Sequence, residues 1–127
     1  MEIPDDSVRR DVALAGPQET AALAATLAKA SRPGDVIALR GDLGAGKTAF
    51  ARAFIRAREV MSGGAGATEV PSPTFTLVIE WPERLGSLLP ADRLDLALRF
   101  GDDEEARVAA MIGFGERGRR LVEAVPA

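Results

Sequence analysis

The stretch Asp35-Val36-Ile37-Ala38-Leu39-Arg40-Gly41-Asp42-Leu43-Gly44-Ala45-Gly46-Lys47-Thr48 decides the fold of this chain. Its first six residues are mostly apolar and predict a buried strand. The next eight follow the pattern Gly-x-x-x-x-Gly-Lys-Thr, which is typical of a phosphate-binding loop. Residues 48–58 then predict a helix with an apolar stripe of Phe50, Phe54 and Ile55. A strand, a glycine-rich loop and a helix in this order are the context that such a loop requires.

The glycine-rich loop predicts a site for a nucleoside triphosphate and Mg²⁺. Its glycines let successive backbone N–H groups turn inward around phosphate oxygens, and the start of the following helix adds the positive end of its dipole. Lys47 is expected to reach the β- and γ-phosphates, and Thr48 to place its hydroxyl on Mg²⁺. The alternative is a glycine-rich turn with a chance lysine. The predicted binding residues of the loop are Gly41, Asp42, Leu43, Gly44, Ala45, Gly46, Lys47 and Thr48.

An acidic residue at the end of a second strand is expected to complete such a site. The apolar run Leu77-Val78-Ile79 ends in Glu80, which is therefore the candidate metal ligand and catalytic carboxylate, with a solvated strand end as the equal alternative. Trp81 could pack on a nucleotide base, although a core position is the simpler interpretation. Asp95 lies in an alternating strand, so we expect it to face solvent rather than to act in catalysis.

Basic residues outside the loop have simpler interpretations. Arg52, Arg56 and Arg58 are expected to form a solvated helix face, and Arg107 could reach a phosphate or lie on the surface. The net charge of −3 argues against binding nucleic acid by bulk electrostatics.

The remaining segments complete an α/β pattern. We expect strands at 11–15, 35–40, 74–81, 93–99 and 107–113, and helices at 21–30, 48–58 and 116–124, with Thr20 capping the first helix. Alternating strands and helices predict a P-loop NTPase-like fold with a mainly parallel sheet flanked by helices. With no repeats, residues 1–127 are expected to form one P-loop ATPase domain.

The composition excludes several kinds of site. The chain has no cysteine and no histidine, so it has no thiolate or imidazole for catalysis or metal binding. Its acidic start, Met1–Asp6, does not resemble a signal peptide, and no apolar run is long enough for a membrane span. A cytoplasmic location is expected.

Three motifs together resemble the TsaE family, the bacterial ATPases of tRNA threonylcarbamoyladenosine biosynthesis. They are the loop with its preceding Leu39-Arg40, the segment Val70-Pro71-Ser72-Pro73-Thr74-Phe75-Thr76-Leu77-Val78, and Ile79-Glu80-Trp81-Pro82-Glu83 with the later Leu89-Pro90 and Asp92-Arg93-Leu94. The resemblance covers the chain from Gly16 onward.

The resemblance implies a small ATPase that uses ATP and Mg²⁺. It would act with the threonylcarbamoyl-transferase proteins TsaD and TsaB and contact tRNA only indirectly. It also implies that Thr48 and Glu80 contact Mg²⁺, that residues 72–76 form a switch-like loop, and that Trp81 and Arg107 lie close to the nucleotide.

One departure from the family pattern concerns catalysis. In the family a His-x-Asp-Leu-Tyr-Arg motif separates the second and third motifs, whereas here Val78 runs directly into Ile79. A chain without histidine and tyrosine has no such motif. We therefore expect either an ATPase with a rebuilt sheet that lacks strands, or a segment omitted at the junction. The functional alternatives are a shortened, catalytically impaired member that acts in binding or assembly and, with little support, a small-molecule kinase.

Overall fold

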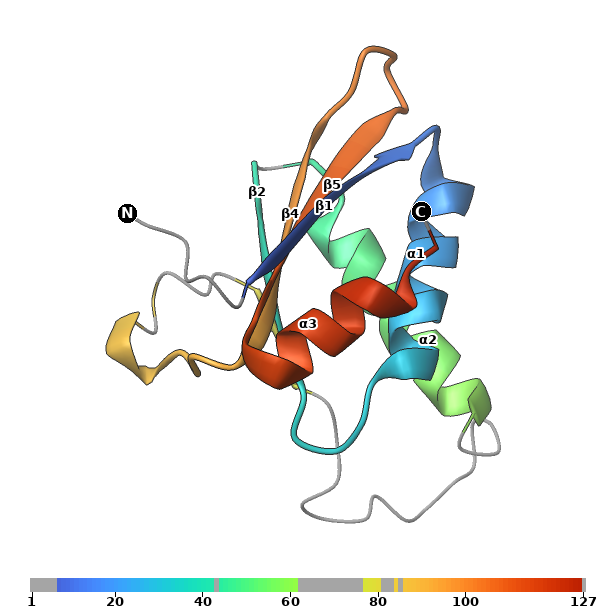
Figure 1. The fold of residues 1–127 in the computed structure, drawn as a ribbon. Helices are drawn as coiled ribbons and strands as arrows, with labels where there is room; N and C mark the ends of the chain where they lie inside the picture. Colours follow the sequence, from blue (N-terminus) through green and yellow to red (C-terminus); the bar gives the residue numbers. More distant parts are fainter. Residues whose placement is uncertain (1–6, 43, 62–76, 81–83, 85, 127) are drawn as a thin grey trace.

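The structure, a computed structural model, describes residues 7–42, 44–61, 77–80, 84 and 86–126. Within these residues a five-stranded sheet has the order β1-β5-β4-β2-β3 (Figure 1). The strands are β1 (Val8–Leu14), β2 (Val36–Gly41), β3 (Leu77–Glu80), β4 (Arg93–Phe100) and β5 (Arg107–Phe114). The helices are α1 (Pro17–Ala30), α2 (Lys47–Met61) and α3 (Gly115–Ala124), with a short 3₁₀ helix, η2 (Gly86–Leu88).

The sheet combines a parallel and an antiparallel half. Strand β2 pairs in parallel with both β3 and β4, whereas β5 pairs antiparallel with both β4 and β1. The predicted α/β, P-loop-like fold is confirmed, although its sheet is mixed. Because β2, β3 and β4 run in one direction, their carboxyl ends meet at one edge of the sheet, which also holds the start of β5.

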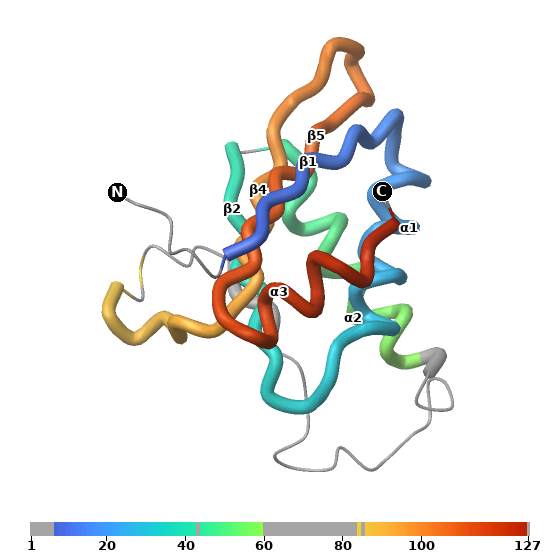
Figure 2. Tube along the Cα trace, in the orientation of Figure 1, coloured from blue at the N-terminus to red at the C-terminus, as the bar shows by residue number. Residues whose placement is uncertain are grey.

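All three helices pack on one face of the sheet, as the ribbon and tube views agree (Figures 1 and 2). Strand alternation turns every second residue toward them, and Leu94, Leu96 and Leu98 of β4 are fully or almost fully buried there. The main helix residues of the same core are Leu23, Leu27, Phe50, Phe54, Leu121 and Val122. No helix in the described part of the chain has the length and apolar character of a membrane span.

Helix α3 lies very close to the sheet at two glycines, Gly113 and Gly118. A Cβ atom added to Gly118 would lie 2.1 Å from the carbonyl oxygen of Arg93, and one added to Gly113 would lie 2.3 Å from that of Gly118. Both neighbours are backbone atoms, which have little freedom to move. Only residues without a side chain therefore allow this helix to lie so close to β4 and β5.

Replacing Gly118 with alanine is expected to lower the free energy of unfolding by about 3 kcal/mol, the upper range for overpacking a filled interior. Helix propensity alone predicts the opposite sign, because alanine is favoured over glycine by about 1 kcal/mol inside a helix. Urea unfolding of the variant and the wild type distinguishes the two effects. A variant as stable as the wild type would mean that α3 can shift away from β4.

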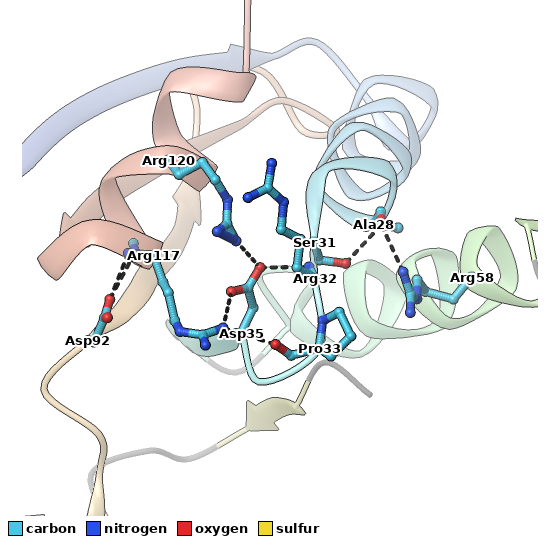
Figure 3. Close-up of polar contacts among 10 residues, drawn as sticks. Ala28, Ser31, Arg32, Pro33, Asp35, Arg58, Asp92, Arg117 and Arg120 are labelled. Carbon is cyan, nitrogen blue, oxygen red and sulfur yellow. Dashed lines mark hydrogen bonds and ion pairs between the residues drawn. The ribbon is translucent and has the colours of Figure 1, made fainter. Parts of the chain in front are cut away.

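A buried carboxylate joins α3 to the start of β2 (Figure 3). Asp35 is completely buried. Its Oδ1 accepts a hydrogen bond from Arg117 Nη1 at 3.1 Å, and its Oδ2 accepts from Arg120 and, at 2.7 Å, from the backbone N–H of Arg32. Asp92 accepts at 2.9 Å from the backbone N–H of Arg117, near the start of α3. These carboxylates fix the helix at the sheet edge opposite the carboxyl ends of the parallel strands.

Three local predictions need correction. Helix α1 begins at Pro17 with Gly16 as its cap, because proline suits the first position of a helix, so Thr20 is not the cap. Ile55, assigned to the apolar stripe of α2, is 55% exposed. Arg58 is not part of a solvated face, because its Nη1 donates to the Ala28 carbonyl at 3.5 Å and it is partly buried.

The Val78–Ile79 junction lies inside β3. Val78 pairs with Ile37 and Ile79 pairs with Ala38, so the register of β3 on β2 is continuous across the junction. Within the predicted strand at 74–81 the structure describes one strand, Leu77–Glu80, which contains both residues of the junction. Residues 74–76 and 81 lie outside the described part.

Candidate nucleotide-binding site

The glycine-rich loop connects the end of β2 to the start of α2. Gly41, the last residue of β2, has a φ of 145°. A Cβ atom on it would lie 2.4 Å from the carbonyl oxygen of Leu98 in β4. Glycine at position 41 therefore satisfies two requirements, an unusual backbone angle and the close approach of β4 at the base of the loop.

The loop conformation depends on two further glycines. Gly44 and Gly46 have φ values of 83° and 106°, a region that residues with a side chain rarely adopt. No heavy atom lies within 4 Å of the position that a Cβ on Gly44 would take. The Ala45 N–H donates to the Asp42 carbonyl at 3.0 Å, and the Phe50 N–H donates to the Gly46 carbonyl at 2.9 Å. The loop is thus tightly turned. Leu43, predicted as a binding residue, lies outside the described residues.

Lys47 is folded back over the loop. It is the first residue of α2 and is only 8% exposed, and its Nζ donates to the Gly41 carbonyl at 2.8 Å. The side chain of Lys47 therefore bridges the two ends of the loop. Thr48 is the second residue of α2 and is exposed, so both predicted polar residues begin the helix.

The predicted acidic residue occupies the same edge of the sheet. Glu80 is the last residue of β3 and pairs with Leu39, two positions before the end of β2. Trp81 follows it outside the described residues. The described part contains no group of three acidic, histidine or cysteine residues that could hold a metal alone. Mg²⁺ commonly takes one or two protein ligands and completes its shell with phosphate and water, so the donor types of Thr48 and Glu80 fit the ion in a nucleotide complex.

Arg107 begins β5 at this edge, where it pairs with Phe100, the last residue of β4. Its Nη1 donates to the carbonyls of Glu104 at 2.9 Å and Ala106 at 2.8 Å. Its guanidinium carbon lies 4.7 Å from the centre of the Phe100 ring. Arg107 is thus at the predicted edge, but it is held in the turn between β4 and β5 and contacts Phe100.

Asp95 lies apart from the loop. It is in the middle of β4, on the face opposite the helices, and its side chain is 15% exposed. Its oxygens pair with Arg93 Nε at 2.7 Å and with Arg40 Nε at 3.4 Å. The prediction that Asp95 faces solvent is therefore only partly correct, because two arginines cover it.

Sequence reasoning missed Phe100 and the Asp35 cluster. Phe100 continues the alternation of Leu94, Leu96 and Leu98, so its place on the helix-covered face could have been found from the spacing. The pairing of Asp35 with Arg117 and Arg120 had no local signal, because more than eighty residues separate the partners.

The sequence resembles known proteins over more than half of its length. The family model described as threonylcarbamoyl adenosine biosynthesis protein TsaE matches residues 14–79, which is more than half of the chain. The match ends next to the Val78–Ile79 junction. A relative named tRNA threonylcarbamoyladenosine biosynthesis protein TsaE from Bacillus subtilis is 41% identical over 90 residues, covering 70% of this chain and 50% of that protein.

A second relative and one solved structure agree. The TsaE protein of Aquifex aeolicus is 41% identical over 83 residues, covering 65% of this chain and 59% of that protein. The chain thus spans about half the length of the curated relatives that it matches. The crystal structure of Bacillus subtilis YdiB superposes with a TM-score of 0.78 at 23% identity, covering 94% of this chain and 95% of that chain, which supports the fold. By sequence motifs and by the family match, the chain belongs to the TsaE family.

Proposed function

We propose that the chain binds ATP with Mg²⁺ at the loop between β2 and α2. The observation that carries this proposal is the buried ammonium of Lys47, which is held 2.8 Å from the Gly41 carbonyl across a loop with two glycines at positive φ. An ammonium on a carbonyl exchanges one oxygen partner for another when phosphate arrives. The start of α2 favours the same negative charge.

The proposed role is that of the ATP-binding and ATP-hydrolysing component of tRNA N6-threonylcarbamoyladenosine biosynthesis. Relatives from two bacteria carry the name of this pathway, and the family model bears the same description. The expected partners are TsaD and TsaB, with tRNA contacted only through them. The cytoplasm remains the expected location.

Each residue of the site would have a defined task. Backbone N–H groups of residues 44–48 would surround the β-phosphate, and Lys47 would offset the charge that develops on the β- and γ-phosphates during hydrolysis. Thr48 would supply a hydroxyl ligand, and Glu80 a carboxylate that holds the ion or orients water. Mg²⁺, when bound, would neutralise phosphate charge. Trp81 and Arg107 are proposed nucleotide neighbours.

A specific observation supports the alternative of a nucleotide-binding member with impaired turnover. Val78 is followed directly by Ile79, and a sequence without histidine and tyrosine has no His-x-Asp-Leu-Tyr-Arg motif with its aspartate. Glu80 would then be the acidic side chain that β3 supplies. Lys47 and the loop would still bind nucleotide.

Two measurements on the same preparation separate these possibilities. Calorimetry gives the affinity for ATP with Mg²⁺, and single-turnover hydrolysis is followed with and without TsaD and TsaB. Hydrolysis that Lys47→Ala abolishes supports the ATPase. Binding without hydrolysis, even with both partners, supports the impaired member. No nucleotide binding contradicts both.

A further inference from the structure

The sheet order points to where the rest of a nucleotide would lie. From β2 the chain passes through α2 to β3 on one side, while β4 lies on the other side of β2. In open α/β sheets, ligands bind outside the carboxyl ends of the strands at such a reversal. Here the reversal lies between β2 and β4. A nucleotide with its phosphates on the loop is therefore expected to extend over the end of β4.

An exposed aromatic ring occupies that end. Phe100 closes β4 and is 52% exposed. It shares its face with Leu98, which lies against Gly41 and whose Cδ1 would be 3.9 Å from a Cβ on Gly46. At about 3.3 Å per residue, Phe100 lies about 7 Å beyond Leu98 along the strand. A large apolar ring in contact with water is unfavourable, because its surface is not removed from water. A role in stacking on a ligand would explain why the ring is exposed beside the glycine-rich loop.

The ring is held in place by the turn that follows it. The Gly101 N–H donates to the Ala106 carbonyl at 2.8 Å and closes the turn. Arg107, fixed by the carbonyls of Glu104 and Ala106, covers the Phe100 ring at 4.7 Å. A cation on the ring is a favourable contact that also limits the motion of the ring. A pre-oriented ring loses little conformational freedom when a ligand stacks on it.

We propose that Phe100, supported by Arg107, is the platform on which the nucleotide base stacks. This inference rests on the proposed nucleotide binding at the loop. Base–aromatic stacking accepts any base, because every base has a π-face. The platform therefore favours nucleotides over inorganic tripolyphosphate and discriminates little between ATP and GTP.

The test compares ligands with and without a base. Calorimetry is performed with ATP, GTP and tripolyphosphate, each with Mg²⁺, on the wild type, Phe100→Ala and Phe100→Trp. Phe100→Ala is expected to weaken ATP and GTP by about 10-fold, within the range for loss of one base–aromatic contact, and to leave tripolyphosphate binding unchanged. Phe100→Trp is expected to retain nucleotide binding. Leu88→Ala, which removes another exposed apolar side chain (79% exposed), is the matched control and should change nothing.

Several outcomes would contradict the proposed role of Phe100. One is unchanged ATP affinity in Phe100→Ala, and another is an equal loss of ATP and tripolyphosphate, which would indicate damage to the loop. Equal affinity of the wild type for ATP and tripolyphosphate would mean that the base contributes nothing. If the wild type binds none of the three ligands, the proposed function itself fails. Thermal unfolding, expected to be the same in all variants, establishes that each is folded.

Discussion

ATP binding is expected to weaken about 100-fold when Lys47 is replaced with alanine, since a hydrogen bond to a charged group contributes up to about 3 kcal/mol. The ammonium is buried in the loop and positioned by the Gly41 carbonyl, so it would meet phosphate without rearrangement of the chain. Calorimetry with ATP and Mg²⁺ measures the loss. Hydrolysis, where present, should fall below detection because the same charge stabilises the transition state.

The chain provides a matched control for this variant. Lys29 is exposed in the last turn of α1, and Lys29→Ala removes the same charge from the protein as a whole. Its ATP affinity should equal that of the wild type. If Lys47→Ala and Lys29→Ala bind ATP equally well, the loop does not hold the phosphates through its lysine.

A loss of stability as large as that of Gly118→Ala is expected for Asp35→Asn. The change keeps the size of the side chain but removes the negative charge shared by Arg117 and Arg120. Breaking a buried ion pair by removing one partner costs about 3 to 5 kcal/mol. Because the arginine side chains are 44% and 27% exposed and can turn toward water, we expect about 3 kcal/mol. Urea unfolding measures it.

Asp11→Asn is the control for charge removal as such. Asp11 pairs with Arg9 at 3.6 Å on the surface, with side chains 45% and 57% exposed, and exposed pairs contribute about 1 kcal/mol or less. The two asparagine variants should therefore differ clearly in their unfolding midpoints. Equal midpoints would mean that Asp35 does not anchor α3.

Much of the fold was predictable because its signals are local. Alternating side chains marked β4, the apolar run before the loop marked β2, and the glycine pattern identified the junction of β2 and α2. The start of α1 was wrong by several residues because Pro17 favours a helix start more strongly than Thr20 does. The mixed sheet could not be derived, since strand order depends on which apolar faces meet in space.

The positions of the candidate site residues in the fold were predictable to a similar degree. The loop, Glu80 and Arg107 lie along one edge of the sheet, because the parallel strands place their carboxyl ends there and β5 begins there. The sequence did not show that Arg107 is bound in the β4–β5 turn, because its hydrogen bonds go to the backbone carbonyls of Glu104 and Ala106. The low exposure of Asp95 likewise depends on its ion pair with Arg40 of the neighbouring strand β2.

Strand β2 carries different tasks at its two ends. Asp35 precedes it and ties α3 to the sheet, while Gly41 ends it and opens the loop, about 20 Å further on at the rise of a strand. Substitutions at sites this far apart, with no shared contacts, usually have additive effects. Substitutions that change the stability of the protein at one end are therefore expected to leave the proposed nucleotide site at the other end unchanged. Substitutions intended to raise the free energy of unfolding should therefore be made first around Arg117 and Arg120 of α3, the partners of Asp35.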